Sequence, residues 1–340
     1  MAWTRVAACL AAVATLLRPL AAEPADFTPD TADMAAAKGE GTLTWYTSTP
    51  VEAAQKIARL FEEQTGIKVQ LFRSGGSAVL RRFMQELDAR KIVADVVTIS
   101  DPAAMNSLIK RDMLVPFRPK HFEKIPAEAK DPQGRYVAQR LNLLGIVVRT
   151  DRGLDLPRTW TDLTDPKYKG KMVMPDPSFT ANQLMAVGTL SRKYGWGFYE
   201  KLRASNIMIV QGNQQVSDTL KSGERLLAAI GTDSYTWNDR QAGHKVQTLF
   251  PAEGAFAIPA PTTVIKGAPH PNAAKAFAEF MISDAVQGLI PQEGNYAARS
   301  DIGPPAGSPQ LGEIKLLAVD YDYIEKEAAN IKKRFNEIFQ

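Results

Sequence analysis

Cysteine is almost absent from this sequence, because Cys9 is the single cysteine among 340 residues. Cys9 falls in an N-terminal segment that we expect to be removed, so residues 23–340 contain none. That absence excludes disulfides, a thiolate nucleophile and a cysteine-ligated metal from the mature chain. Such a chain must be stabilised by burying apolar side chains, and its length favours two domains over one.

A strong charge of one sign is also missing. The sequence has 41 Lys and Arg against 37 Asp and Glu, and the basic residues are scattered along the chain. Proteins that bind nucleic acid cluster their basic residues on one face or one helix. We therefore expect no nucleic-acid partner. The three histidines (His121, His244 and His270) show no metal-ligand spacing, and we expect them at the surface.

Familiar catalytic motifs are lacking as well. The chain has no GxSxG elbow, no Cys/His pair, no HExxH and no P-loop. We therefore predict that the protein is not an enzyme. An exported enzyme stays open as an alternative, because Asp101 and Asp233 could face one cleft from opposite lobes and a fold does not fix a function.

The first 22 residues have the pattern of a secretory signal peptide. Arg5 provides the positive start, and Val6 to Leu17 is an apolar run too short to span a bilayer comfortably. The small residues of "PLAAEP" predict cleavage after Ala22. Removal of this segment lowers the net charge from +4 to about +2. An uncleaved membrane anchor is the alternative.

Strand-like and helix-like segments alternate through the first part of the mature chain. Thr49, Pro50 and Glu52 have the spacing of a helix start with a capping box. The predicted order is strand 42–48, helix 49–66, strand 67–72, helix 77–90, strand 94–100 and helix 101–112. This order predicts an α/β fold in which a mostly parallel sheet is flanked by helices.

Two apolar strands, at 141–150 and 254–267, are placed to cross between this unit and a second α/β unit. Two crossings between two lobes form a hinge, and ligands favour the cleft at such a hinge. We predict one lobe from residues 23–141 plus 259–307. The other would be formed by residues 142–258 plus 308–340.

Five segments resemble a known family in the right order. They are "GTLTWYTSTPVEAAQKIARLFEEQTGIKV", "ADVVTISDPAAMNSLIKRDMLVPF", "GKMVMPDPSFTANQL", "SGERLLAAIGTDSYTW" and "KGAPHPNAAKAFAEFMIS". Together they resemble extracellular solute-binding proteins of ABC importers, in the branch of the periplasmic ferric-ion, phosphonate and sugar-phosphate binders. The resemblance implies a two-lobed type II periplasmic binding fold. We accordingly expect a periplasmic monomer without a cofactor, whose partners are a small-molecule ligand and an inner-membrane ABC permease.

The stretch "DSYTW" (233–237) bears on whether the protein binds ferric ion. In the ferric-ion-binding relatives the matching segment carries two adjacent tyrosines as iron ligands, whereas here Tyr235 is followed by Thr236. Pro50 falls about where many of those proteins place another ligand. Fe(III) needs several anionic oxygens, and Tyr235 with Asp101 would supply few. We predict no metal site; the alternative, a ferric-ion carrier, would use Tyr235 and Asp101.

Four loops predicted to face the cleft are rich in hydroxyls and amides, and each leads into a helix. They are "TST" (47–49), "SGGS" (74–77), "PSFT" (177–180) and "QGN" (211–213). Strand ends and helix starts share one edge of a parallel sheet, and helix N-termini attract anions. We predict capture of a small anionic or zwitterionic solute: a phosphonate, phosphate ester, sulfonate or carboxylate. The predicted ligand-binding residues are Ser48, Thr49, Gly76, Ser77, Asp101, Ser178, Thr180, Asn213, Asp233 and Tyr235.

Helix capping would by itself explain part of this set. Thr49, Ser77 and Asn213 are good N-caps, and each cap contributes roughly 1 kcal/mol. Asp233 has two interpretations, pairing with an ammonium group on the ligand or capping a turn. Tyr235 follows a buried strand at its C-terminal end, which favours a place in the cleft.

Overall fold

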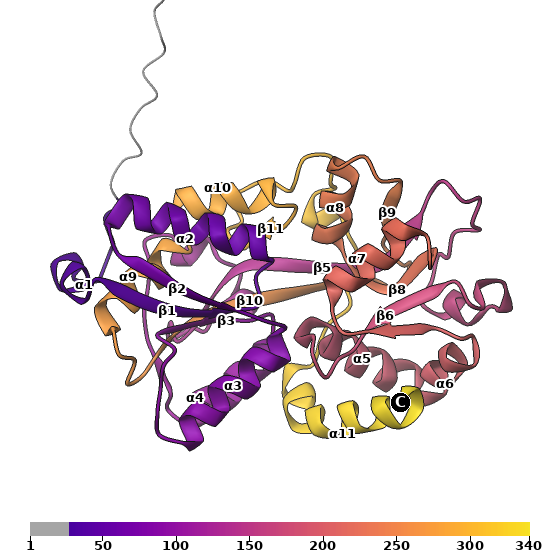
Figure 1. The fold of residues 1–340 in the computed structure, drawn as a ribbon, viewed down its shortest axis with the longest axis horizontal. Coiled ribbons are helices and arrows are strands. Elements are labelled where there is room, and N and C mark those ends of the chain that lie inside the picture. Colours follow the sequence, from indigo (N-terminus) through magenta and orange to yellow (C-terminus); the bar gives the residue numbers. More distant parts are fainter. Residues whose placement is uncertain (1–26) are drawn as a thin grey trace, which may run out of the picture.

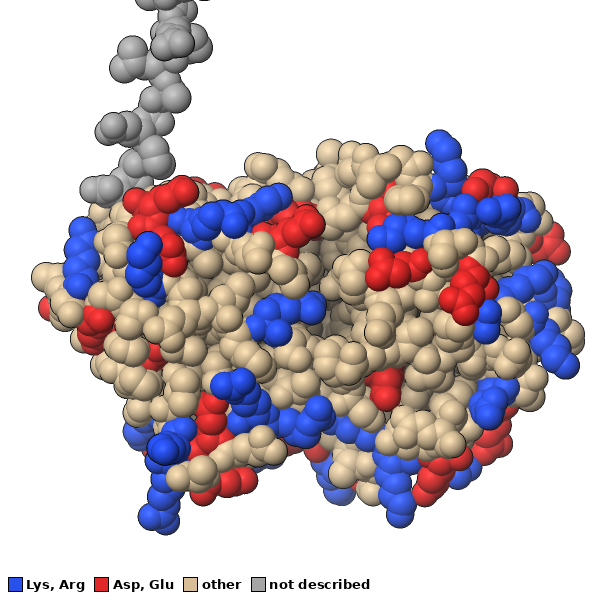
Figure 2. All heavy atoms as spheres, in the orientation of Figure 1, with Lys and Arg blue, Asp and Glu red and all other residues tan. Residues whose placement is uncertain are grey.

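The computed structural model describes residues 27–340, which form two lobes joined by two long strands (Figure 1). The predicted signal peptide at 1–22, including Cys9, lies outside the described residues. Within residues 27–340 no helix is long and apolar enough to cross a membrane. On the face shown in Figure 2, basic and acidic side chains are interspersed over both lobes.

The first lobe is built on parallel strands in the order β2-β1-β3, with β10 antiparallel beside β3. Its elements are α1 (Met34–Glu40), β1 (Thr42–Thr47), α2 (Val51–Thr65), β2 (Lys68–Arg73), α3 (Gly76–Asp88), β3 (Val96–Thr98), α4 (Pro102–Lys110), β4 (Leu114–Val115), the short 3-10 helices η1 (Phe122–Lys124) and η2 (Ala127–Ala129), α9 (Pro271–Phe280), α10 (Asp284–Gln292) and β11 (Tyr296–Ala297). The predicted βαβαβα order is therefore present, with boundaries shifted by a few residues.

The second lobe repeats this plan with parallel strands in the order β8-β6-β7. Its elements are η3 (Thr161–Thr164), η4 (Pro166–Tyr168), β6 (Met172–Pro175), α5 (Ala181–Tyr194), α6 (Trp196–Ala204), β7 (Met208–Val210), α7 (Asn213–Ser222), β8 (Leu227–Thr232), α8 (Asp233–Gln241), β9 (Val246–Leu249) and α11 (Tyr321–Phe339). The short 3-10 helix η5 (Leu311–Glu313) precedes α11 in the chain, and Leu311 packs against the core of the first lobe. Helix α11 packs on α5 of this lobe and also meets α4 of the first lobe.

Two long antiparallel strands connect the lobes, β5 (Val137–Arg149) and β10 (Phe256–Ile265). They pair with each other between Phe256–Thr262 of β10 and Val137–Leu144 of β5, and they lie in the middle of the strand order β2-β1-β3-β10-β5-β8-β6-β7. The two crossing strands predicted from apolar runs are thus present. The first of them starts four residues earlier than predicted, at Val137 rather than at 141, and that extension carries Arg140, which lines the cavity described below.

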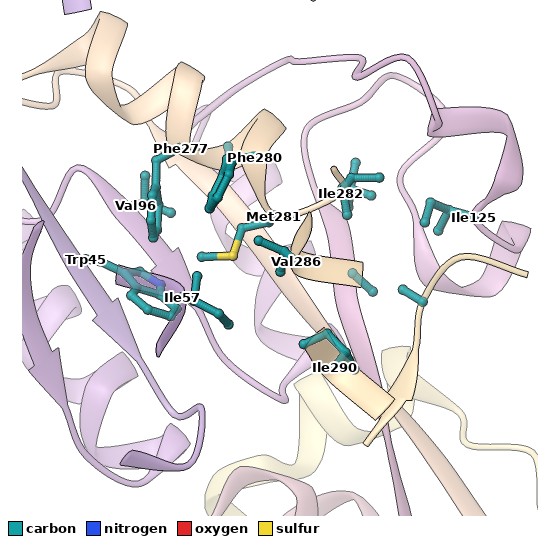
Figure 3. Packing of buried hydrophobic residues seen from close by; sticks show 14 of the residues in the cluster. Trp45, Ile57, Val96, Ile125, Phe277, Phe280, Met281, Ile282, Val286 and Ile290 are labelled. Carbon is teal, nitrogen blue, oxygen red and sulfur yellow. The ribbon is translucent and has the colours of Figure 1, made fainter. Parts of the chain in front are cut away.

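Each lobe has its own hydrophobic core. In the first lobe, Phe277 of α9 packs against Trp45 of β1 (Figure 3), with ring centroids 5.0 Å apart in an edge-on arrangement. Phe277 packs edge-on against Phe61 of α2 at the same centroid distance, 5.0 Å. All three side chains are fully buried. Burying one Phe of this kind stabilises a fold by roughly 1.5–3 kcal/mol. The rigid cores allow the lobes to hold the cleft residues in place.

The boundary between the two cores falls within the crossing strands. On β5, Leu143 belongs to the core of the first lobe and Leu144 to that of the second. On β10, Ile258 belongs to the second core and Val264 to the first. The predicted boundaries after residues 141 and 258 stay a prediction.

The predicted helix caps are wrong at three places. The N-cap of α2 is Pro50, which has no side chain to cap with, so the capping box of Thr49 and Glu52 does not form. The N-cap of α3 is Gly75, two residues before the predicted cap Ser77, which lies within the first turn of the helix. Asn213 is the first residue of α7, behind Gly212. Local capping therefore does not account for the polar side chains of Thr49, Ser77 and Asn213.

Candidate functional site

A cavity of about 250 Å³ lies between the two lobes. Helices α2, α3, α5, α7 and α8 all begin at its wall, because each follows a strand whose C-terminal end reaches the cleft. Their free N–H groups make this edge favourable for an anion. The lining residues are Ser48, Pro50, Arg73, Gly75, Gly76, Ser100, Arg140, Asn142, Phe179, Thr180, Ala181, Asn182, Gln211, Gly212, Asn213, Gln214, Gln215, Thr232, Ser234 and Tyr235.

Arg140 is the most unusual residue in the cavity wall. It lies on β5, it is 1% exposed, and burial lowers the pKa of its guanidinium from 12.5 to about 10. Its hydrogen-bond acceptors are all neutral: Gln139 Oε1 at 2.8 Å, Thr49 Oγ1 at 2.9 Å and Asn142 Oδ1 at 3.3 Å. The guanidinium therefore stays charged at neutral pH, buried and without a counter-charge from its bonding partners. Burying such a charge is unfavourable unless a ligand neutralises it.

Arg73, at the end of β2, brings a second guanidinium to the same cavity. Its Nε donates to the backbone oxygen of Thr49 at 3.1 Å, and its Nη2 donates to the phenol oxygen of Tyr235 at 3.4 Å. Neither Arg73 nor Arg140 takes part in any of the ion pairs formed within residues 27–340. Two positive charges thus face the cavity without an acidic partner.

Carboxylates are missing from the cavity wall, among the residues that the structure describes. The side chains that do line it carry hydroxyl and amide groups, and some are linked to one another. Asn142 Nδ2 donates to Ser100 Oγ at 2.9 Å, and Asn182 Nδ2 donates to Thr232 Oγ1 at 3.3 Å. The wall is therefore positive where the arginines lie and neutral but hydrogen-bonding elsewhere.

The two lobes touch each other beside this cavity. The backbone N–H of Ser77 on α3 donates to the carbonyl oxygen of Phe179 at 3.2 Å, and Arg81 Nη1 donates to the carbonyl oxygen of Ser178 at 3.0 Å. Gly75 makes this approach possible, because a Cβ atom there would lie 2.4 Å from the carbonyl oxygen of Phe179. The loop of residues 177–180 thus closes against the start of α3.

The predicted site residues divide into three groups. The structure brings five of them to the cavity wall: Ser48, Gly76, Thr180, Asn213 and Tyr235. Two lie directly behind the wall, because Thr49 accepts a hydrogen bond from Arg140 and Ser77 contacts the loop at 177–180. The remaining three, Asp101, Ser178 and Asp233, do not line the cavity.

Asp101 lies in a different cavity, also of about 250 Å³, between α3 and α4 of the first lobe and α5 and α11 of the second. Its Oδ1 accepts from the backbone N–H of Ala104 at 3.0 Å and so caps α4. Burial raises the pKa of its carboxyl from 3.8 to about 6. Asp233 is buried at the first position of α8, and burial raises its carboxyl pKa as well. The predicted pair of Asp101 and Asp233 in one cleft is therefore not formed.

The pair of residues that an iron site would use is also separated, since Tyr235 lines the cleft and Asp101 the other cavity. Within residues 27–340 no group of three or more His, Cys, Asp or Glu side chains is placed to hold a metal ion. The phenol oxygen of Tyr235 accepts a hydrogen bond from the cation of Arg73.

Sequence reasoning missed both arginines and most of the amides. Arg140 carries a visible signal, because it is a charged residue inside the apolar strand "VAQRLNLLGIVV", which is buried throughout. The predicted strand began at residue 141, so Arg140 fell just outside it and was not considered. Arg73 and the amides of Gln214 and Gln215 carry no comparable signal, since exposed segments have similar compositions.

Comparison with known proteins agrees with this architecture. Residues 91–327 match the family described as bacterial extracellular solute-binding protein. A relative from Salmonella typhimurium is the "Putative 2-aminoethylphosphonate-binding periplasmic protein", which is 25% identical over 276 residues covering 78% of this chain and 77% of the relative.

Two solved structures share the fold. The periplasmic binding protein AfuA from Actinobacillus pleuropneumoniae, with exogenous fructose-6-phosphate bound, has a TM-score of 0.80 at 21% identity and covers 88% of this chain and 98% of its own. Iron-bound HitA from Pseudomonas aeruginosa has a TM-score of 0.75 at 20% identity, and the match covers 86% of this chain and 99% of the HitA chain. The protein therefore belongs to the bacterial extracellular solute-binding proteins and has the two-lobed fold of type II periplasmic binding proteins.

Proposed function

We propose that the protein is the substrate-binding component of an ABC importer and captures a small solute with a negative charge in the periplasm. The candidate solutes are phosphonates, phosphate esters, sulfonates and carboxylates, as simple anions or as zwitterions. The lobes would close around one ligand and present it to a permease in the inner membrane. In this scheme ligand binding shifts the population toward the closed form.

The buried guanidinium of Arg140 carries this proposal. Its hydrogen-bond acceptors are neutral, and it faces a cavity that Arg73 also lines. Charged groups that are buried in proteins are paired or bind an ion, because an unpaired buried charge is costly. An anion bound in the cleft would supply the missing charge, and charge-assisted hydrogen bonds from arginine are among the strongest in proteins.

Ferric ion is the second candidate, supported by the fold shared with iron-bound HitA and by Tyr235 in the cleft. The charge of the site favours the anion, because Fe³⁺ would lie beside two guanidinium groups. The alternative of an exported enzyme rested on Asp101 and Asp233, and neither side chain lines the cleft.

Native mass spectrometry of the protein purified from an export-competent host tests this proposal, together with a ferric-ion absorbance scan of the same sample. We expect a bound organic anion, no tyrosinate–iron band, and loss of the bound mass in Arg140→Gln. A metal adduct with that band would contradict anion capture. Titration calorimetry with a panel of anions, on protein unfolded and refolded to remove bound ligand, measures the affinity directly.

A further inference from the structure

We propose that the cleft selects organic phosphates or phosphonates whose remaining part is neutral and bears hydroxyl groups, and that it rejects solutes with an ammonium group. This inference rests on the proposed function and narrows it. Anionic and zwitterionic solutes are both compatible with an arginine in the cleft. The other side chains of the wall distinguish between them.

The charge of the site favours a doubly charged group. Arg73 and Arg140 are the charged side chains of the cavity wall in residues 27–340, and neither is neutralised by an ion pair there. A phosphoryl group carries about −1.5 to −2 charges at pH 7 and three acceptor oxygens. It therefore balances two guanidinium groups, whereas a single carboxylate or sulfonate balances one.

The remainder of the wall is suited to hydroxyl groups. Asn182 and Ser234 line the cavity at 5% and 4% exposure, and both Asn182 Oδ1 and Ser234 Oγ lack a hydrogen-bond partner in the described structure. A buried polar atom without a partner is costly, and Asn182 Oδ1 can only accept, so these atoms favour a ligand that donates hydrogen bonds. Hydroxyl groups supply such donors without adding charge, and they can also accept from Ser234 Oγ.

An ammonium group would lack a partner in this cleft. Asp101, the buried acid near the seam between the lobes, faces the other cavity, and Asp233 is absent from the wall. An ammonium inside the closed cleft would share a small space with two guanidinium groups and would meet only neutral oxygens. Like charges that are desolvated together oppose binding strongly.

The size of the cavity limits the solute further. Sites for drug-sized ligands measure roughly 300–1,000 Å³, whereas this cavity measures about 250 Å³. The ligand is therefore small, of the order of a short-chain or single-ring phosphate rather than a nucleotide.

Two matched pairs of ligands test the inference by titration calorimetry at pH 8. The first pair is 2-hydroxyethylphosphonate and 2-aminoethylphosphonate, and the second is 2-hydroxyethyl phosphate and phosphoethanolamine. Within each pair a hydroxyl replaces an ammonium on the same frame. At pH 8 the phosphate monoesters, with a second pKa of about 6, are almost fully ionised, and a primary amine is still protonated. Arg140 remains charged, since the pKa of its guanidinium is about 10.

We expect the hydroxyl member of each pair to bind at least about tenfold more tightly, as expected for repulsion between desolvated like charges. Equal affinities, or tighter binding of the ammonium member, would overturn the inference and leave anion capture intact. If the refolded wild-type protein binds no anion from the wider panel, the proposed function fails and the inference fails with it.

The substitution Asn213→Asp would add a carboxylate to the wall of the cavity. Asn213 lines the cavity at the first position of α7, where an acidic side chain is compatible with the helix dipole. Asn213→Asp should reduce the preference for the hydroxyl member at least about fivefold, because the new carboxylate can pair with the ammonium. Asn330→Asp makes the same change at an exposed position of α11 and should leave the preference unchanged. If Asn213→Asp kept the wild-type preference for the hydroxyl member of each pair, charge repulsion would not be the cause of that preference.

Discussion

The phenol oxygen of Tyr235 accepts a hydrogen bond from Nη2 of Arg73 across the cleft, at 3.4 Å. Arg73 ends strand β2 of the first lobe, and Tyr235 lies in helix α8 of the second. The bond therefore spans the space into which a ligand must fit. A phenol that already accepts from a cation is suited to help bind an anion.

Tyr235→Phe should weaken anion binding without unfolding the protein. The substitution keeps the ring and removes one hydroxyl, so we expect a loss of about 1 kcal/mol in binding free energy, or roughly fivefold in affinity. Calorimetry with the ligand identified by mass spectrometry measures this loss. Tyr323→Phe, on α11 away from the cleft, is the matched control. Unchanged affinity in Tyr235→Phe would remove this phenol from the site.

Gly75→Ala should block closure of the lobes. Gly75 has φ −64° and ψ 146°, a conformation that alanine adopts freely, so the first lobe itself can fold normally. With the lobes arranged as in this structure, the new Cβ would lie 2.4 Å from the carbonyl oxygen of Phe179, which is too close for any real contact. We expect at least about a tenfold loss of affinity, because closure contributes the contacts of the second lobe.

Small-angle X-ray scattering checks that prediction, since Gly75→Ala should not become more compact when ligand is added. Gly197→Ala is its control, because Gly197 lies in α6 with open space where a Cβ would be. Normal compaction of Gly75→Ala with ligand would show that the contact between residues 75 and 179 is dispensable.

Asp101→Asn should stabilise the protein at neutral pH. Burial raises the folded-state pKa of Asp101 from 3.8 to about 6, so between these values the folded state binds more protons than the unfolded state. The stability that this proton provides is present below pH 4 and is lost as the pH rises through 6. The shift corresponds to about 3 kcal/mol. Asparagine keeps the cap on α4 and never ionises.

Urea unfolding at pH 7.5 and at pH 4.5 tests this sign. We expect the advantage of Asp101→Asn to be largest at pH 7.5 and to shrink by more than half at pH 4.5. An advantage that does not change with pH would show that the ionisation of Asp101 is not its source.

Arg140→Gln should abolish anion binding without lowering the stability of the ligand-free protein. The substitution removes a buried positive charge whose acceptors are neutral, so the ligand-free protein should be as stable as the wild type or more stable, by about 1–3 kcal/mol. Anion binding should fall below detection in the same variant. A large loss of stability in urea would show instead that Arg140 serves the structure of β5 more than the ligand.

The sequence by itself determined the alternation of strands and helices, the two crossing strands and the loops that lead into the cleft. These features follow from local physics: apolar periodicity sets strand and helix, and glycines such as Gly66, with φ 76°, end a helix. The two crossings predicted two lobes, and the ordered resemblance of five segments to a known family implied the same fold. Ser48, Gly76, Thr180, Asn213 and Tyr235 were found this way, because each follows a strand that ends at the cleft.

Only the tertiary structure decided which polar groups share the cleft. Asp101 and Ser100 are neighbours in sequence, yet the peptide turns between them and places them in different cavities. Arg73 and Arg140 lie far apart in the chain, and both are brought to one cavity by the order of strands around β10 and β5. The net charge of the cleft depends on residues that lie far apart in the sequence. No local sequence pattern indicates which of them will meet, so the positive, carboxylate-free character of the cleft is visible only in the folded chain.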